Sequence, residues 1–147
     1  KAPLAYWTRR YSETQVTPVY VSGAHLALLT NRQAGSGGDE LPHEFQQKGM
    51  GPVIGTRTWG GLVGISMSFD LMDGSSVTAP DYRIYTPDGR WTVENEGVTP
   101  DIIVELDPAE MARGWDAQLQ KGIEVLLAAI EREPLVRPQH PPFPVLR

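Results

Sequence analysis

The order of apolar and polar positions predicts a strand, a turn and a helix in the first third of the chain. Residues 24–30 form a short apolar run between turn signals, and its length favours a buried strand. A loop of small residues, 31–39, follows. Residues 40–48 then show helical spacing, with Pro42 expected in the first turn and Gly49 expected to help end the helix.

Short strands are predicted over the middle of the chain and two helices after them. The predicted strands, separated by Gly- and Asp-containing turns, are residues 52–55, 62–69, 76–78, 82–85, 90–93 and 102–105. Asp107 and Pro108 are typical of an N-cap and a first helical residue. Apolar residues then recur at i, i+4, i+8, i+11, i+12 and i+15 from Trp115 to Ile130, which predicts an amphipathic helix.

The two ends of the chain have no such periodicity. Residues 1–18 mix aromatic, basic and small polar side chains, and we expect them to be irregular or edge structure. Five prolines after position 133 prevent a helix there. We therefore expect one folded subdomain over residues 1–133 and a proline-rich extended tail over 134–147.

Composition and charge narrow the class of protein. With 147 residues, 40% of them hydrophobic, the chain is the size of one domain and can bury a core. A net charge of −5 without a concentrated basic face argues against binding to nucleic acid. No apolar run approaches the roughly 18 residues of a membrane span. Because cysteine is absent, disulfides, thiolate zinc sites and a cysteine nucleophile are all excluded.

The compartment and the extent of the chain are weaker inferences. Absence of cysteine suits a reducing cytosol and a disulfide-free exported protein alike, and we expect a cytoplasmic protein. The chain has 15 glycines and 13 prolines without a period, which indicates many tight turns. It begins at Lys1 rather than Met, and we expect it to be part of a longer polypeptide.

Ser36 is the candidate nucleophile. It lies between glycines at the predicted strand-to-helix turn, where small neighbours allow a sharp turn. A helix N-terminus supplies free N–H groups and positive potential to a developing oxyanion, and the N–H of Gly37 would be the natural donor. The alternative is that Ser36 only caps the helix. Local spacing does not decide between the two.

A serine nucleophile needs a base, and the chain holds three histidines. His25 lies in the apolar run and is interpreted as a core or strand-edge residue. His43 lies seven residues after Ser36 on the same helix, roughly 10 Å away and too far for a hydrogen bond, so we interpret it as a surface residue. Ser36, Asp101 and His140 follow the chain order of an α/β-hydrolase triad, which leaves a self-contained esterase-type hydrolase as an alternative.

Glu94 and Glu96 are candidate functional carboxylates. Alternation along a predicted strand places both on one face and Val93 on the other. A solvated strand edge is the simpler interpretation. A paired-carboxylate site for metal or glycoside chemistry lacks a third ligand or a nearby histidine, so we expect neither a metal nor a cofactor.

Three blocks of sequence resemble the C-terminal catalytic subdomain of the tricorn protease family. They are Asn31 with Ala-Gly-Ser-Gly-Gly-Asp at 34–39, Gly-Pro-Val-Ile-Gly-Thr-Arg-Thr-Trp-Gly-Gly-Leu-Val-Gly-Ile at 51–65, and Val-Glu-Asn-Glu-Gly-Val-Thr-Pro-Asp-Ile at 93–102. Asp-Ala-Gln-Leu at 116–119 matches as well. The resemblance covers residues 24–133 in order, and the Gly-Thr-Arg-Thr-Trp-Gly-Gly stretch makes it specific.

The resemblance implies an α/β fold of the crotonase-like type, built of β-β-α spiral turns, and a serine peptidase related to tail-specific proteases. Such enzymes use a Ser–His–Ser–Glu tetrad. The nucleophile corresponds to Ser36, the acid to Glu94 and one oxyanion donor to the N–H of Gly37. In the family the acid reaches the histidine through a second serine. The implied substrates are short peptides or unfolded proteins.

The resemblance also implies partner domains and an oligomer, and it shows where this chain differs from the family. Family members carry β-propellers and a PDZ domain upstream and assemble as hexamers. Their histidine, its neighbouring serine and the other oxyanion glycine lie upstream of this segment, so we expect the isolated chain to be inactive. The family's acidic S1 residue corresponds to the region of Tyr6 and Trp7, which has no acid, so an apolar P1 preference is expected.

A non-catalytic assembly or peptide-binding module of the same fold is the other interpretation. A relic of an enzyme would be free to lose Ser36, Gly37 and Glu94. Their presence favours a working enzyme.

Overall fold

The structure, a computed structural model, describes residues 3–9, 11, 13–21, 23–136, 138–143 and 145. These residues belong to two compact units, one of residues 26–126 and one that combines 1–25 with 127–147. The sequence boundary between residues 133 and 134 stays a prediction.

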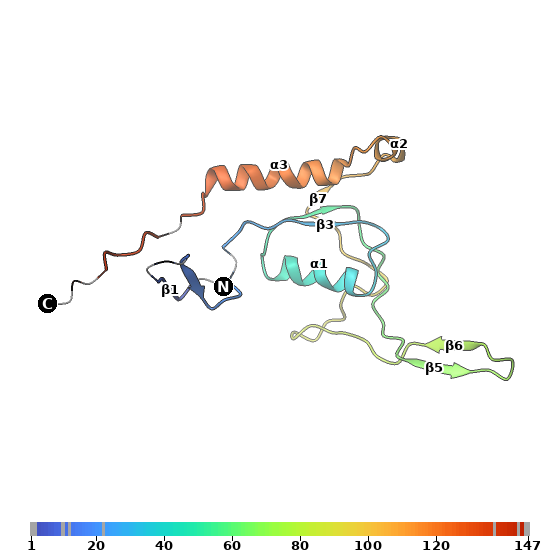
Figure 1. The fold of residues 1–147 in the computed structure, drawn as a ribbon. Coiled ribbons are helices and arrows are strands. Elements are labelled where there is room, and N and C mark those ends of the chain that lie inside the picture. The colour runs from blue at the N-terminus through green and yellow to red at the C-terminus, as the bar shows by residue number, and fades with distance from the viewer. Residues whose placement is uncertain are drawn as a thin grey trace. The chain divides into compact units, whose positions relative to one another are not determined.

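A three-stranded parallel sheet is the centre of the larger unit. Its order is β3 (Leu28–Thr30), β4 (Val53–Gly55) and β7 (Ile102–Ile103). Helix α1 (Gly37–Gln47) connects β3 to β4, as parallel strands require a crossover. Figure 1 shows α1 on one side of this sheet, and α3 (Ala117–Arg132) starting on the other.

The middle strand carries the core because helices cover it on both faces. Val53 and Ile54 are completely buried, and Phe45 of α1 is nearly so. Full burial of such side chains contributes about 1.5–3 kcal/mol each. On the other face Gly122 of α3 lies against Leu29, where a Cβ would come within 3.3 Å of Leu29 Cδ2. The sheet thereby holds both ends of α1 and the segments after β3 and β4 in fixed places.

Helix α1 starts earlier than the sequence indicates. It begins at Gly37 rather than at residue 40, directly after Ser36. Pro42 therefore lies in the second turn, and the prediction of a first-turn proline was wrong. Since proline has no N–H, it cannot donate to the Gly38 carbonyl one turn earlier. The end of the helix is as predicted, with Gly49 at φ 58°.

An aspartate caps each of the two later helices, and the cap at Asp107 is the predicted one. The carboxylate of Asp107 accepts the N–H of Ala109 at 2.7 Å and starts α2 (Pro108–Ala112). Asp116 accepts the N–H of Leu119 at 2.9 Å and caps α3. Within the larger unit the apolar stripe of α3 is not what contacts the sheet. Leu119 and Ile123 are exposed, and the buried residues of the helix are Gln118 and Gly122.

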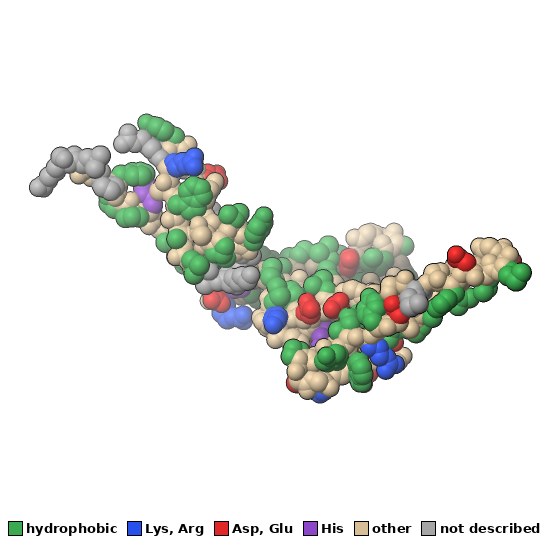
Figure 2. Space-filling view, turned by 90° about the horizontal axis from the view of Figure 1, so that it is seen from below, with side chains coloured by type: hydrophobic (Ala, Val, Ile, Leu, Met, Phe, Trp, Pro, Cys, Tyr) green, Lys and Arg blue, Asp and Glu red, His purple; other side chains and the backbone are tan. Residues whose placement is uncertain are grey.

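A long hairpin extends from the sheet and α1 (Figure 1). Its strands, β5 (Met67–Asp70) and β6 (Ser76–Ala79), pair antiparallel, with Asp70 opposite Ser76. Figure 2 shows hydrophobic side chains along this arm, and Phe69 and Met72 are among the exposed ones. The predicted strand at 76–78 is confirmed. Of the predicted strand at 62–69 only the last part forms.

Two further predicted strands were wrong. Residues 82–85 and 90–93 make only isolated bridges, Tyr85 with Trp91 and Tyr82 with Gly64. Their side chains enclose a small second cluster instead, formed by Leu62, Val93 and Val98, with Ile84 packed against it. Residues 93–96 are a bend and a turn. This turn matters for the position of Glu94.

The smaller unit contains a short antiparallel pair. Strand β1 (Ala5–Trp7) pairs with β2 (Gln15–Thr17), so part of the segment expected to be irregular or edge structure is a regular hairpin. The described residues after 133 belong to no helix or strand. Within the described part of the chain, no helix has the length and apolarity to cross a membrane.

Candidate active site

Ser36 lies at a sharp turn between β3 and α1. Its φ of 54° and ψ of −118° place a non-glycine residue in a region that costs on the order of 1–3 kcal/mol. The side chain of Ser36 is exposed. A strained strand-to-helix turn that presents a serine hydroxyl to solvent is the geometry of a nucleophile in hydrolases.

Ser36 occupies the N-cap position of α1 without acting as a side-chain cap. Its hydroxyl makes no capping hydrogen bond, while its carbonyl accepts the N–H groups of Asp39 at 2.8 Å and Glu40 at 3.0 Å. The N–H of Gly37 donates to no atom of the described residues. The hydroxyl and a helix N-terminal donor are thus both available, as stabilisation of an oxyanion requires. The interpretation of Ser36 as a mere cap loses its support.

The segment that follows β4, residues 58–63, runs beside the Ser36 turn. The Ser36 N–H donates to the carbonyl of Gly61 at 2.9 Å, and the Trp59 N–H donates to the carbonyl of Ala34 at 2.8 Å. Gly60 has a φ of 87°, and a Cβ there would lie 2.7 Å from the Gly97 nitrogen. Only glycine fits this close approach of two backbone segments.

Asp39 fixes segment 58–63 to the first turn of α1. Its side chain is completely buried. One carboxylate oxygen accepts the N–H of Gly60 at 2.8 Å and the other that of Gly61 at 3.0 Å. Hydrogen bonds to a charged acceptor are stronger than neutral ones, and here they compensate for burying the acid.

Glu94 binds the next two residues of the same segment. Its Oε2 accepts the N–H of Leu62 at 2.5 Å and of Val63 at 2.8 Å. These residues directly follow Gly61, whose carbonyl receives the Ser36 N–H. Segment 58–63 therefore brings the candidate nucleophile and the candidate acid to one place.

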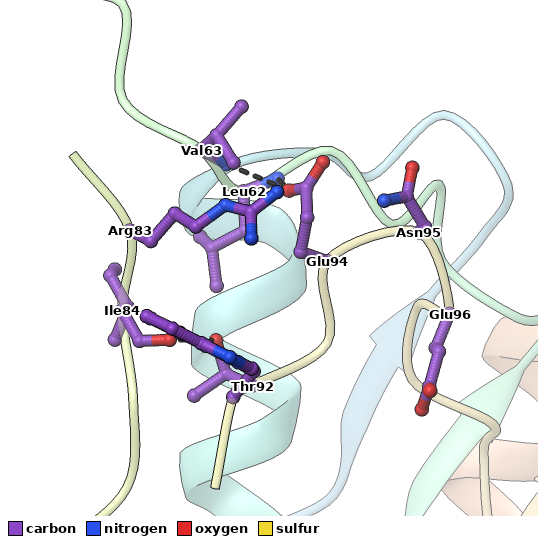
Figure 3. A pocket seen from close by; sticks show the side chains of 9 residues that line it. Leu62, Val63, Arg83, Ile84, Thr92, Glu94, Asn95 and Glu96 are labelled. Carbon is purple, nitrogen blue, oxygen red and sulfur yellow. Dashed lines mark hydrogen bonds between the residues drawn. The ribbon is translucent and has the colours of Figure 1, made fainter. Parts of the chain in front are cut away.

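A cavity of about 230 Å³ lies at Glu94 (Figure 3). It is also lined by Arg83 and Trp91, with the Arg83 guanidinium 5.6 Å from the Trp91 ring centroid. Figure 3 shows Glu94 directed toward Leu62 and Val63 and Glu96 directed away. The prediction that both glutamates share a strand face was wrong, because they lie in a turn. Within the described residues, no three His, Asp or Glu side chains form a group that could hold a metal.

Both carboxylate oxygens of Asp101, the acid of the alternative triad, accept hydrogen bonds from the fold. Its Oδ2 accepts the N–H of Val53 at 2.7 Å, and its Oδ1 accepts the side-chain amide of Gln46 at 3.0 Å. Both oxygens thus connect β4 and α1. Asp101 helps to hold the fold together at this point.

Within the larger unit, the described hydrogen bonds join no histidine to Ser36. His25 Nε2 lies 2.7 Å from the carbonyl of Glu133, and His140 Nδ1 lies 2.8 Å from the carbonyl of Pro141. His43 is half-buried and its Nε2 is buried without a described partner, so its prediction as a surface residue was wrong. Within the larger unit, the candidate nucleophile, the candidate oxyanion donor and the candidate acid thus have no hydrogen-bonded base.

A protein-family model matches most of the chain. The model of peptidase family S41 matches residues 5–104. The chain belongs to peptidase family S41. Within the family it is 40% identical over 113 residues to tricorn protease homolog 1 of Streptomyces coelicolor, a match that covers 77% of this chain and 11% of that protein.

Tricorn proteases are similar to this chain in sequence and in structure. The tricorn protease of Thermoplasma volcanium is 35% identical over 136 residues, which are 92% of this chain and 13% of that protein. A crystal structure of the tricorn protease superposes with a TM-score of 0.82 at 34% identity, over 89% of this chain and 13% of that one. The α/β fold is therefore similar to that part of the tricorn protease, and the chain spans a small part of the length of these relatives.

Two residues beside the Ser36 turn, Asp39 and Trp59, had no role predicted from the sequence. Asp39 stood in the matched block, but only the fold shows that it binds Gly60 and Gly61. The sequence signal that could have indicated this role of Asp39 is an acid three residues after the serine, in the first helical turn. Trp59 likewise lay in the specific Trp-Gly-Gly stretch, and its position beside the Ser36 turn was not foreseen.

Proposed function

We propose that this chain carries the nucleophile of a tricorn-like serine peptidase and that Ser36 attacks the carbonyl of a peptide bond. The Ser36 Oγ forms a bond to the carbonyl carbon, and its proton passes to a histidine. The Gly37 N–H binds the oxyanion of the tetrahedral intermediate. Collapse breaks the C–N bond and the amine leaves with the proton; water then hydrolyses the ester. The strained, uncapped Ser36 turn is the observation that carries this proposal.

Glu94 is proposed as a positioning residue. Its Oε2 is held by two backbone N–H groups, while its Oε1 has no hydrogen-bond partner among the described residues. That oxygen can accept a hydroxyl from a second serine, which in turn orients the histidine. We propose that an upstream part of the parent polypeptide supplies both residues.

The whole protein is proposed to resemble its relatives in organisation. It would have a crotonase-like catalytic subdomain, upstream PDZ and β-propeller domains, and a hexameric assembly in the cytoplasm. Its substrates would be short peptides or unfolded proteins with an apolar P1 residue. The small share of the relatives' length that the chain matches supports an active site completed elsewhere in the polypeptide.

The self-contained triad has less support. Asp101 already accepts two structural hydrogen bonds through its two oxygens. Deleting residues 134–147 removes His140 and would abolish activity if Ser36, Asp101 and His140 formed the site. In a tricorn-like peptidase the same deletion leaves activity mostly unchanged.

The deciding experiment uses the full-length parent polypeptide and its Ser36→Ala variant. Both are treated with a fluorophosphonate probe, and the adduct is mapped by mass spectrometry. Labelling at Ser36 that disappears in the variant is the expected result. An unlabelled parent would overturn the peptidase proposal and favour a peptide-binding module.

A further inference from the structure

Trp59 is a large exposed aromatic side chain beside the candidate nucleophile. Its side chain is held close to two glycines, because a Cβ at Gly35 or at Gly61 would come within 2.5 Å of a ring carbon. Gly35 precedes Ser36, and Gly61 accepts the Ser36 N–H. The ring therefore adjoins both backbone segments that fix the nucleophile. It is nevertheless 64% exposed.

The surroundings of Trp59 hold the ring in place from one side. Its backbone N–H donates to Ala34, which fixes the start of the side chain. The ring can lie against the backbone at residues 35 and 61 because both are glycines, since a Cβ at either position would collide with it. Single exposed apolar residues are common and need no special explanation. The Trp59 ring differs, because it can lie in this position only if residues 35 and 61 are glycines. A ring ordered in advance loses little entropy when a ligand covers it.

The chemistry offered by the outer side of the ring is apolar. The indole N–H has no hydrogen-bond partner among the described residues, and the nearby Asp39 is buried with both oxygens in use. Tryptophan is the side chain most enriched where a few contacts dominate binding, because it covers a large area at low entropic cost.

We infer that Trp59 is a substrate-binding platform that contacts an apolar side chain of a residue flanking the scissile bond. The inference rests on the proposed peptidase function and adds a specificity determinant to it. A peptide carbonyl at Ser36 places the neighbouring side chains next to Gly35 and Gly61, where the ring lies. An apolar side chain there would cover the exposed part of the ring.

The first test separates contact with substrate from support of the nucleophile. The full-length polypeptide and its Trp59→Ala and Trp59→Phe variants are labelled with a small alkyl fluorophosphonate and with peptidyl phosphonates bearing Leu, Asp or Lys next to phosphorus. Trp115→Ala is the control, since Trp115 is also exposed and contacts neither glycine. We expect Trp59→Ala to slow labelling by the Leu probe about 10- to 100-fold, with labelling by the alkyl probe within about twofold. Trp59→Phe should recover part of the rate.

Several results would overturn the inference. Equal loss with both kinds of probe would show that Trp59 only supports the turn. An unchanged rate with the Leu probe would show no contact, and a loss confined to the Asp or Lys probe would refute an apolar partner.

A second test does not depend on catalysis. The Ser36→Ala polypeptide is labelled with 5-fluorotryptophan, and the Trp59 resonance is assigned from the Trp59→Phe variant. Apolar peptides should shift that ¹⁹F signal, while peptides with Asp or Lys in place of the apolar residues should not. No shift with any peptide overturns the platform. If no probe labels Ser36 in the unsubstituted protein, the peptidase proposal fails by itself, and the ¹⁹F measurement still decides the role of Trp59.

Discussion

At the residue scale, the site depends on carboxylates that accept backbone N–H groups. Asp39 binds Gly60 and Gly61, and Glu94 binds Leu62 and Val63, so two acids hold four consecutive N–H groups. Hydrogen bonds of this kind fix a loop without any regular secondary structure. Of the two acids, Asp39 uses both oxygens in this way, whereas Glu94 uses one and keeps the other for a further partner.

The structure predicts that Glu94→Gln separates the two roles of this glutamate. The amide oxygen can still accept the N–H groups of Leu62 and Val63, so the midpoint of urea unfolding should hardly change. Loss of the negative charge should lower kcat/KM of the full-length polypeptide on a short peptide by roughly 100-fold or more, since a neutral group stabilises the imidazolium poorly. Glu96→Gln is the matched control and should change kcat/KM less than about threefold. Equal effects of the two substitutions would refute the assignment.

At the element scale, the connection from β3 to α1 combines strain with close packing. Helix α1 begins directly after Ser36, and segment 58–63 lies against the residues before it. The glycines around Ser36 therefore differ in function. Gly35 makes room for the Trp59 ring, whereas a Cβ at Gly37 would meet no atom within 4 Å.

This difference predicts opposite effects of two alanine substitutions. Gly35→Ala forces the Trp59 ring to move and should lower the free energy of unfolding by about 1–3 kcal/mol. Gly37→Ala adds a methyl group in open space at the first helical residue and should be neutral or stabilise by up to about 1 kcal/mol. Urea denaturation of the two variants measures both values. Similar destabilisation by both would contradict the arrangement of the ring on Gly35.

At the scale of the whole molecule, the candidate site shows no base within the unit of residues 26–126. The candidate nucleophile Ser36, the candidate oxyanion donor Gly37 and the candidate acid Glu94 all lie in this unit, and His43, the histidine of the same unit, makes no described hydrogen bond to them. The chain matches 11% of the Streptomyces coelicolor homologue and 13% of the tricorn protease of known structure. Activity is therefore expected of the parent polypeptide.

The corresponding prediction concerns the isolated 147-residue chain. Ser36 near neutral pH is a poor nucleophile without a base, so mixing the chain with an activated ester such as a p-nitrophenyl ester should release no burst of product. Stopped-flow absorbance measures this directly, with the full-length polypeptide as the positive control. A stoichiometric burst that Ser36→Ala removes would show that the chain contains its own base.

Local sequence signals predicted the elements near the nucleophile. The apolar run before residue 31, the glycines around Ser36 and the helical spacing after them gave the order of strand, turn and helix. The bounds were less accurate, because the strand forms only over Leu28–Thr30 and the helix starts three residues earlier than predicted. Asp107 and Pro108 predicted a helix start equally well. In each case the signal lies within a few residues of the element, where backbone preferences and side-chain caps act.

The positions of Glu94 and of the α3 face depend on contacts between distant parts of the chain, which local sequence patterns do not show. Glu94 was placed on a strand because alternation is a local rule, yet its position follows from the N–H groups of Leu62 and Val63. The apolar pattern of α3 likewise predicts an apolar face on the helix but not the surface that this face contacts. In the larger unit the buried residues of α3 are Gln118 and Gly122.

The sequence by itself determined the family resemblance, the serine at the strand-to-helix turn and the helix caps, because each depends on neighbouring residues. Only the tertiary structure decided that segment 58–63 joins Ser36 to Glu94, that Asp39 fixes this segment and that Trp59 lies on two glycines. These features depend on which backbone N–H groups remain unpaired after the sheet has formed. Carboxylates from other segments then accept some of these N–H groups, and a linear pattern carries no information about which acid will do so.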